Sequence, residues 1–282
     1  LGLSSHDPAT LADLAAWVEG GDALDEDGDG DRSEARLAFG DPGVEPPVVL
    51  RYAGEPVERR VFVATGDGLV HALDGETGRE RWVFLPAAGL AGLRRLADTA
   101  ETRVRSGRPG ALRASFLDLD GDGAVDATAG ERASLLLAMG GGARGYAALD
   151  VTRPDRPRVS WSIDTTGWPA LGETLSPPLA ARMRIDAARQ GGDLRVAVLT
   201  GGYDPLQRAR GAAADAVGGR LAIVSVGSGE VLWQAAARDG AGVDLVDPGL
   251  TASFAASPRA VDTDGDGLAD RIYALDVAGR LW

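Results

Sequence analysis

The feature that most constrains the fold is a repeat of short apolar runs, separated by glycine turns and ending in tryptophan. Residues 60–84 read RVFVATG-DG-LVHALD-GETG-RERWVF, which is three strands joined by two tight turns. Residues 134–161 and 195–234 repeat this pattern, and another copy begins RIYALDVAGRLW at Arg271. Repetition of one supersecondary unit predicts an array of similar units packed side by side.

A further short strand precedes each copy, so the predicted unit is four antiparallel strands. Trp82, Trp161 and Trp233 stand near the end of the fourth strand in the three complete copies. This is the makeup of a propeller blade, and we predict an all-β propeller, partial and open as it stands here. A β-sandwich of repeated hairpins is the alternative. The aligned tryptophans favour blades, because each blade must pack a bulky residue against its neighbour. The predicted blades span 46–84, 114–164, 177–236 and, in part, 257–282.

Residues 1–45 are predicted to form a lead-in segment with one short helix. Asp7 can cap this helix, Pro8 fits its first turn, and Gly20 and Gly21 end it. Its predicted apolar stripe consists of Leu11, Leu14, Ala15 and Val18. A second helix is predicted at about 90–102.

Composition excludes several functions. The formal net charge is −13 and lysine is absent, which argues against nucleic acid as a partner. Cysteine is also absent, so there is no disulfide framework or thiolate metal site. No apolar run approaches the roughly 18 residues that cross a bilayer. The chain begins and ends inside its repeat pattern, and we interpret it as a fragment whose missing signal peptide says nothing about export.

Much of the negative charge lies in three loops with aspartate at every second position. Positions 1, 3, 5, 7 and 9 are Asp118, Asp120, Asp122, Ala124 and Asp126 in one loop, and Asp262, Asp264, Asp266, Leu268 and Asp270 in another. A looser third loop contains Asp25, Asp27 and Asp29, with Ser33 at position 9. Both regular loops follow the first strand of a predicted blade.

This spacing predicts Ca²⁺ sites. Ca²⁺ prefers six to eight hard oxygen ligands, which carboxylates at positions 1, 3, 5 and 9 and the carbonyl of position 7 can supply. Glycine at position 6 permits the sharp turn. Without a cation, these carboxylates would repel one another by roughly several kcal/mol in total. An EF-hand would need a bidentate Glu at position 12, which is Ala129, Tyr273 or Arg36 here. The alternatives are a solvated acidic turn, and a metal that only staples the fold.

Catalytic motifs are missing from the sequence. His6 and His71 are its only histidines, and His71 is predicted to be packed or half-exposed within a strand. No HExxH, GxSxG or phosphate-binding glycine loop occurs. Gly140, Gly141 and Gly142 join two strands, so they are expected to form a turn. We therefore predict that the chain is not an enzyme.

Longer segments carry a family resemblance. ALDGETGRERW at 72–82 resembles the repeat of quinoprotein-type propellers, which pyrroloquinoline quinone dehydrogenases share with cofactor-free scaffolds. RRVFVATGDGLVHALDGETGRERWVFLP, GGGARGYAALDVTRPDRP and SPRAVDTDGDGLADRIYALDVAGRLW together look like the C-terminal propeller of the PilY family of type IV pilus biogenesis factors and tip-associated adhesins. EDGDGDRSEARLAFGD looks like that family's lead-in, so the resemblance runs from about Asp22 onward.

The resemblance implies a function for one loop. In the family, the matching loop is a Ca²⁺ site that regulates pilus extension and retraction, and it maps onto Asp262, Asp264, Asp266 and Asp270. It also implies an exported protein at the outer membrane, the pilus tip or the cell surface, working with pilins and the pilus machinery. The host surface is a further partner that the resemblance implies for the whole protein, and the resemblance assigns adhesive specificity to an N-terminal domain outside this sequence. A quinone-dependent dehydrogenase and a purely structural Ca²⁺ propeller are the rival interpretations.

Overall fold

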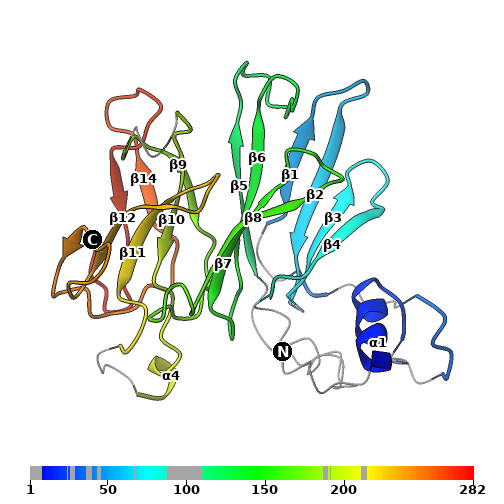
Figure 1. Ribbon diagram of the computed structural model, residues 1–282, viewed down its shortest axis with the longest axis horizontal. Coiled ribbons are helices and arrows are strands. Elements are labelled where there is room, and N and C mark those ends of the chain that lie inside the picture. The colour runs from blue at the N-terminus through cyan, green and yellow to red at the C-terminus, as the bar shows by residue number, and fades with distance from the viewer. Residues whose placement is uncertain are drawn as a thin grey trace.

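The structure, a computed structural model, contains four antiparallel sheets that lie side by side in chain order (Figure 1). It describes residues 8–23, 25, 29–35, 40–42, 46–66, 68–87, 110–186, 190, 192–210 and 215–282. Among these, almost all regular structure is β-strand. The second helix predicted at 90–102 lies outside the described residues.

Each of the first three sheets contains a four-stranded antiparallel meander, as expected for a propeller blade, and the third sheet has a fifth strand beside it. The first contains β1 (Val48–Tyr52), β2 (Glu58–Ala64), β3 (Val70–Asp74) and β4 (Glu80–Phe84). The second contains β5 (Ala111–Leu117), β6 (Arg132–Ala138), β7 (Gly145–Asp150) and β8 (Arg158–Asp164). The third contains β9 (Leu179–Arg182), β10 (Arg195–Thr200), β11 (Arg220–Ser225) and β12 (Val231–Ala236), with β13 (Leu245–Val246) added in parallel.

The fourth sheet is a two-stranded part of a blade. β14 (Arg259–Val261) pairs with β15 (Arg271–Tyr273), and residues 274–282 form a turn closed by a bridge between Leu275 and Leu281. The first strands of successive blades contact one another: β1 meets β5, β5 meets β9, and β9 meets β14. The fold is therefore an open arc of propeller blades, as predicted.

The tryptophans mark the same structural point in each complete blade. Trp82 lies opposite Ala72, Trp161 opposite Ala148, and Trp233 opposite Ile223, and a β-bulge follows directly in all three ladders. The indole Nε1 of Trp82 donates to the carbonyl of Pro154 at 2.7 Å, in the next blade. Trp161 repeats this contact at 2.8 Å, with Val226 of the third blade. The bulge thus accompanies a side chain that reaches the neighbouring blade.

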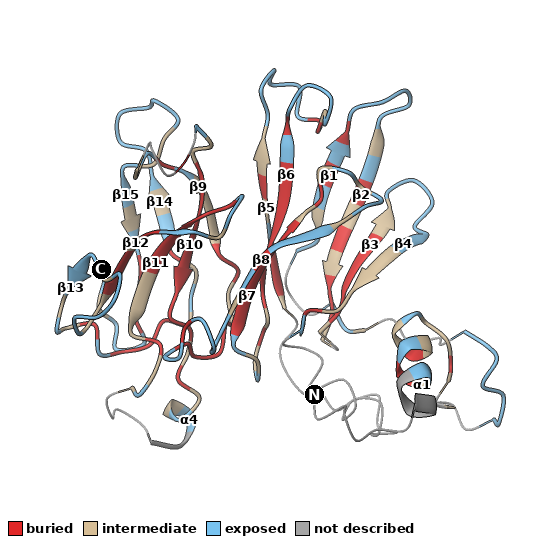
Figure 2. Cartoon of the chain, in the orientation of Figure 1, coloured by how far each residue is buried: buried red, intermediate tan, exposed pale blue. Residues whose placement is uncertain are grey.

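The cores lie between blades, which explains the nearly continuous apolar runs of the second strands. In β6, Leu135 and Leu137 pack toward the first blade, whereas Leu136 and Ala138 pack toward the third. Because successive side chains of a strand point to opposite faces, a sheet covered on both faces needs apolar residues at every position. Figure 2 shows this as buried colour along most of β6 and β7.

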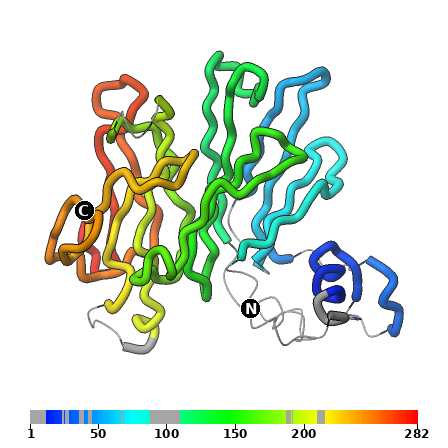
Figure 3. The backbone as a smooth tube through the Cα atoms, viewed as in Figure 1, coloured from blue at the N-terminus to red at the C-terminus, as the bar shows by residue number. Residues whose placement is uncertain are grey.

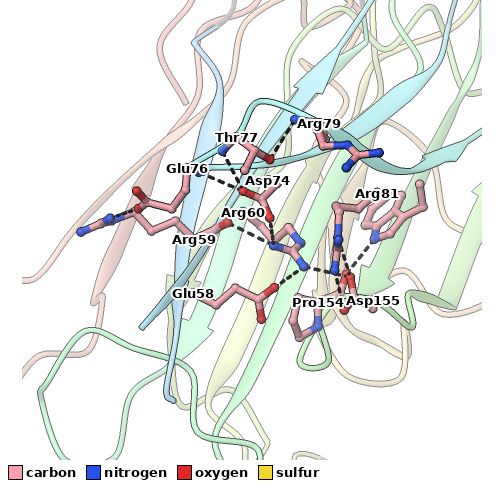
Figure 4. Close-up of polar contacts among 11 residues, drawn as sticks. Glu58, Arg59, Arg60, Asp74, Glu76, Thr77, Arg79, Arg81, Pro154 and Asp155 are labelled. Carbon is pink, nitrogen blue, oxygen red and sulfur yellow. Dashed lines mark hydrogen bonds and ion pairs between the residues drawn. The ribbon is translucent and has the colours of Figure 1, made fainter. Parts of the chain in front are cut away.

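A buried arginine joins the first two blades (Figure 4). The side chain of Arg60, in β2, is fully buried, and its Nη2 lies 2.8 Å from Oδ1 of Asp155 in the β7–β8 turn. Glu58 and Asp74 pair with the same guanidinium, and Arg81 reaches Asp155 from β4. A charge this deeply buried needs such partners, since its desolvation is otherwise uncompensated.

The N-terminal helix, α1 (Pro8–Val18), forms where predicted and lies apart from the sheets (Figure 3). Its predicted apolar stripe is wrong at Ala15, which is exposed, and it omits Trp17, which is buried beside Leu14. Asp7 lies outside the described residues. A second short helix, α4 (Gln207–Arg210), interrupts the third blade between β10 and β11.

Candidate metal centres

Both regular acidic loops join the first strand of a blade to its second strand. Residues 118–131 connect β5 to β6, and residues 262–270 connect β14 to β15. The loops lie at the same edge of the molecule, uppermost in Figures 1 and 3. The same blade position therefore holds the acidic loop in the second and the fourth blade.

The two loops share their internal hydrogen bonds at position 1. Oδ1 of Asp118 accepts from the amide of Gly121 at 2.6 Å, and Oδ2 accepts from Gly123 at 3.1 Å. In the second loop, the oxygens of Asp262 accept from Gly265 at 2.7 Å and from Gly267 at 2.8 Å. These glycines have φ between 71° and 82°, a left-handed conformation that glycine adopts without strain.

Positions 3 and 5 also match between the loops. Asp120 accepts from the amide of Asp122 at 3.1 Å, and Asp264 accepts from that of Asp266 at the same distance. The position-5 carboxylates each accept from the amide two residues on, which belongs to Ala124 or Leu268. One oxygen of each position-3 carboxylate is left without a hydrogen bond from within the loop.

The closing carboxylate differs between the loops. In the second loop, Oδ2 of Asp270 accepts from the amide of Thr263 at 2.7 Å and from its hydroxyl at 2.6 Å. In the first loop, the corresponding amide, that of Leu119, donates instead to Oε1 of Glu131 at 2.7 Å. Glu131 is buried, and its Oε2 also accepts from the amide of Asp126 at 2.8 Å.

The carboxylate of Asp126 accepts hydrogen bonds from the turn that follows it. Its Oδ1 accepts from the amide and hydroxyl of Thr128 and from the amide of Ala129. Sequence spacing alone missed Glu131, because four further residues, 127–130, separate it from the nine-residue pattern. The signal available was an acidic residue placed directly before a strongly apolar strand.

Two groups of carboxylates come close enough to share a cation. One oxygen from each of Asp118, Asp120 and Glu131 lies within 4.8 Å of the others, and the same holds for Asp262, Asp264 and Asp270. At that distance each pair of charges repels by about 1 kcal/mol even at the dielectric constant of water. An all-oxygen donor set fits Ca²⁺, with Asp122, Asp266 and the carbonyls of Ala124 and Leu268 available nearby.

Hydrogen bonds favour the charged form of the second loop's carboxylates. The amides of Gly265 and Gly267 hold the pKa of Asp262 below its ordinary value. The hydroxyl and amide of Thr263 likewise lower the pKa of Asp270. Both carboxyl groups are therefore ionised at neutral pH.

Each loop is also attached to the preceding blade. The amide of Val125, at position 8 of the first loop, donates to the carbonyl of Arg51 in β1 at 2.8 Å. The amide of Ala269, at position 8 of the second loop, donates to the carbonyl of Arg182 in β9 at 2.7 Å. Ordering either loop therefore also fixes the contact between two blades.

The third acidic loop is only partly described. Asp25 has φ 56° and accepts from the amide of Gly30 at 3.0 Å, and Asp29 accepts from the amide of Asp31 at 2.7 Å. Asp27 lies outside the described residues. Ser33, at position 9, donates through its amide and hydroxyl to Asp31. Its predicted metal site stays a prediction.

His71 is packed, as predicted. It is buried in β3, with Nδ1 at 2.6 Å from Oε2 of Glu80 and Nε2 at 3.2 Å from the hydroxyl of Thr65. Thr65 is fully buried, so its hydroxyl is closed off from solvent, whereas the carboxylate of Glu80 is partly exposed. We interpret this arrangement of hydroxyl, imidazole and carboxylate as a structural hydrogen-bond chain.

The fold and the loops define a class: a β-propeller domain with acidic loops between the first two strands of its second and fourth blades. No protein-family model matches the chain. It is 27% identical over 258 residues to the type IV pilus biogenesis factor PilY1 of Pseudomonas aeruginosa, covering 85% of this chain and 19% of that protein. It is 31% identical over 228 residues to a PilY1 homologue of Xylella fastidiosa, covering 79% and 14%.

A solved structure supports the same assignment. The crystal structure of the P. aeruginosa PilY1 C-terminal domain matches this chain with a TM-score of 0.52 and 24% identity. The match covers 80% of the present chain and 38% of the crystallised one, and it shows that the two share a fold. The resemblance to the PilY family is therefore confirmed, and the matching part is the C-terminal propeller domain. The chain spans less than a fifth of the length of the PilY1 proteins it matches.

Proposed function

We propose that this chain is a calcium-binding propeller module of an exported type IV pilus assembly protein, and that it has no catalytic activity. Ca²⁺ binds the loops at 118–131 and 262–270 and holds adjacent blades together. Its occupancy modulates pilus extension and retraction, or the affinity for pilins and other parts of the pilus machinery. The proposed location is the outer membrane, the pilus tip or the cell surface. No described helix is long and apolar enough to cross a membrane.

One observation carries the proposal: both loops attach to the preceding blade at the residue before position 9, through Val125 and Ala269. A cation that draws together Asp118, Asp120 and Glu131 orders the backbone that carries Val125. The second loop does the same for Ala269. The free energy of calcium binding to a loop therefore also stabilises the contact between the two adjacent blades.

The pilus part of the proposal is supported by the relatives, which are named as type IV pilus biogenesis factors. The acidic loops supply a means by which calcium could act on such a protein. Since the chain matches only a small part of those relatives, the activity of the whole protein enters here as a proposal.

Calcium binding is tested by isothermal titration calorimetry of the purified chain with Asp264→Asn and a matched control, Asp239→Asn. Asp239 is an exposed aspartate in the β12–β13 connection, and it also accepts from a neighbouring amide. We expect dissociation constants below about 1 mM for the unaltered chain and the control. Asp264→Asn should lose one binding event. Absence of calcium binding by the unaltered chain contradicts the proposal.

A purely structural calcium staple is the second candidate, because the same attachment between blades favours it. The two differ in the cell. With Asp264→Asn in the full-length protein, the regulatory proposal expects altered surface piliation and twitching at unchanged protein level. The structural one expects loss only in proportion to loss of folded protein. No described contact specifically favours the quinone-dependent dehydrogenase.

A further inference from the structure

A polar hollow of about 340 Å³ lies at the end of the second blade, beside the first acidic loop. The ends of β6, β7 and β8 and the turn at 151–157 build its wall. Four arginines line it, namely Arg132, Arg153, Arg156 and Arg158, together with Glu131 and Asp150. Four guanidinium groups against two carboxylates give this hollow a formal charge of +2, in a chain whose net charge is −13.

The side chains of the four arginines are exposed. None of them forms an ion pair with a residue that the structure describes, in contrast to Arg60, Arg195 and Arg280. The nearest acidic residue of the same turn, Asp155, is engaged by Arg60 and Arg81 of the first blade. The turn therefore directs its carboxylate to the interface between blades and leaves its cations beside the hollow.

The two carboxylates of the hollow are held by backbone groups. Glu131 accepts from the amides of Leu119 and Asp126, and Asp150 accepts from the amide of Thr152 at 2.9 Å. Neither lies within ion-pair distance of the four arginines. The guanidinium groups consequently keep their hydrogen-bond donors for a ligand.

We propose that this hollow is a binding site for an oxyanion: a carboxylate, sulfate or phosphate group. Guanidinium groups present paired N–H donors whose spacing matches two oxygens of such a group, and each contact is charge-assisted. The volume is within the range of small-ligand sites, so it admits an anionic group together with part of the molecule that carries it.

Glu131 belongs to both the hollow and the carboxylate group of the first acidic loop. If the proposed calcium function holds, a cation bound by Asp118, Asp120 and Glu131 cancels negative charge at the edge of the hollow. Calcium then tightens anion binding. This coupling rests on the proposed function, whereas the anion site itself does not require calcium.

The test is calorimetric titration of the purified chain with sulfate and, separately, succinate, in calcium-free buffer at low ionic strength, where surface charges are least screened. We expect saturable binding of at least one probe, and the probe that binds identifies the oxyanion. Arg153→Gln combined with Arg158→Gln should weaken binding about tenfold, because two charge-assisted contacts are lost. Asp150→Asn removes a competing charge and should tighten it about threefold.

The matched control is Arg144→Gln. Arg144 is exposed in the β6–β7 turn, at the opposite end of the same strands, and should change the affinity by less than about twofold. Equal weakening by Arg144→Gln overturns the proposal, as does the absence of saturable binding of either probe. Adding calcium tests the coupling by itself: an unchanged anion affinity, with calcium bound, overturns the coupling alone.

Discussion

The backbone amide of Ala269 donates a hydrogen bond to the carbonyl oxygen of Arg182 at 2.7 Å, joining the acidic loop of the fourth blade to the first strand of the third. Val125 and Arg51 form the same contact between the second and first blades at 2.8 Å. Because each of these bonds joins position 8 of an acidic loop to the first strand of the preceding blade, the acidic loops are parts of the interfaces between blades.

The first prediction distinguishes Glu131 from Asp126 as the closing ligand of the first loop. In a chain already carrying Asp264→Asn, so that calorimetry follows the first loop, Glu131→Gln should weaken calcium binding at least about tenfold. Asp126→Asn should change it less than about twofold, since Asp126 caps the turn at Thr128 and its amide replacement can still accept those bonds. If Asp126→Asn loses calcium binding and Glu131→Gln keeps it, the closing ligand is Asp126, as the nine-residue spacing predicts, and the assignment to Glu131 is wrong.

The second prediction concerns Asp155. Replacing it by Asn leaves the buried guanidinium of Arg60 with Glu58 and Asp74, so the loss is smaller than for an isolated buried charge. We expect the free energy of unfolding to fall by about 1–2 kcal/mol, measured by urea denaturation. The control Asp239→Asn, on the exposed β12–β13 connection, should stay within about 0.5 kcal/mol. Equal effects would mean that Asp155 adds nothing to this interface.

The third prediction is a pH dependence at Asp193. Burial alone would raise its pKa, but the guanidinium and amide of Arg195 outweigh this and lower the pKa below its ordinary value. A carboxyl whose pKa is lowered by folding stabilises the protein above its unfolded pKa, and this contribution is lost as the pH falls through the folded pKa. The difference in unfolding free energy between the unaltered chain and Asp193→Asn should therefore shrink below about pH 4. A difference that stays constant from pH 7 to pH 3 contradicts the assignment.

Local patterns in the sequence were enough for the blades and for the acidic loops. Alternating strands, turn glycines and Trp82, Trp161 and Trp233 are each set by neighbours within one hairpin, so their spacing carries the information. The internal bonds of the loops are local too, which is why Asp118 and Asp262 form equivalent turns.

Contacts between distant segments could not be predicted in the same way. Asp155 pairs with Arg60 across 95 residues, and the carbonyl of Arg51 was one of many backbone groups that could receive Val125. Glu131 required knowledge of the path that the chain takes after Asp126. In each case the partner is chosen by how blades pack, which depends on the whole arc.

The last prediction isolates one contact between blades with two matched turn glycines. Gly229, in the β11–β12 turn, has φ +73°, and Gly78, in the β3–β4 turn, has φ +70°. A Cβ at Gly229 would lie 2.5 Å from Cγ of Trp161, whereas one at Gly78 would meet nothing within 4 Å. Alanine at either site carries the cost of a left-handed backbone, roughly 1 kcal/mol.

Only Gly229→Ala should also displace the indole of Trp161 and weaken its bond to the carbonyl of Val226. We therefore expect Gly229→Ala to lower the free energy of unfolding by about 1–3 kcal/mol more than Gly78→Ala, measured by urea denaturation of both variants. Tryptophan fluorescence should change with Gly229→Ala alone. Equal destabilisation by the two substitutions would show that the turn glycine does not support the contact between the second and third blades.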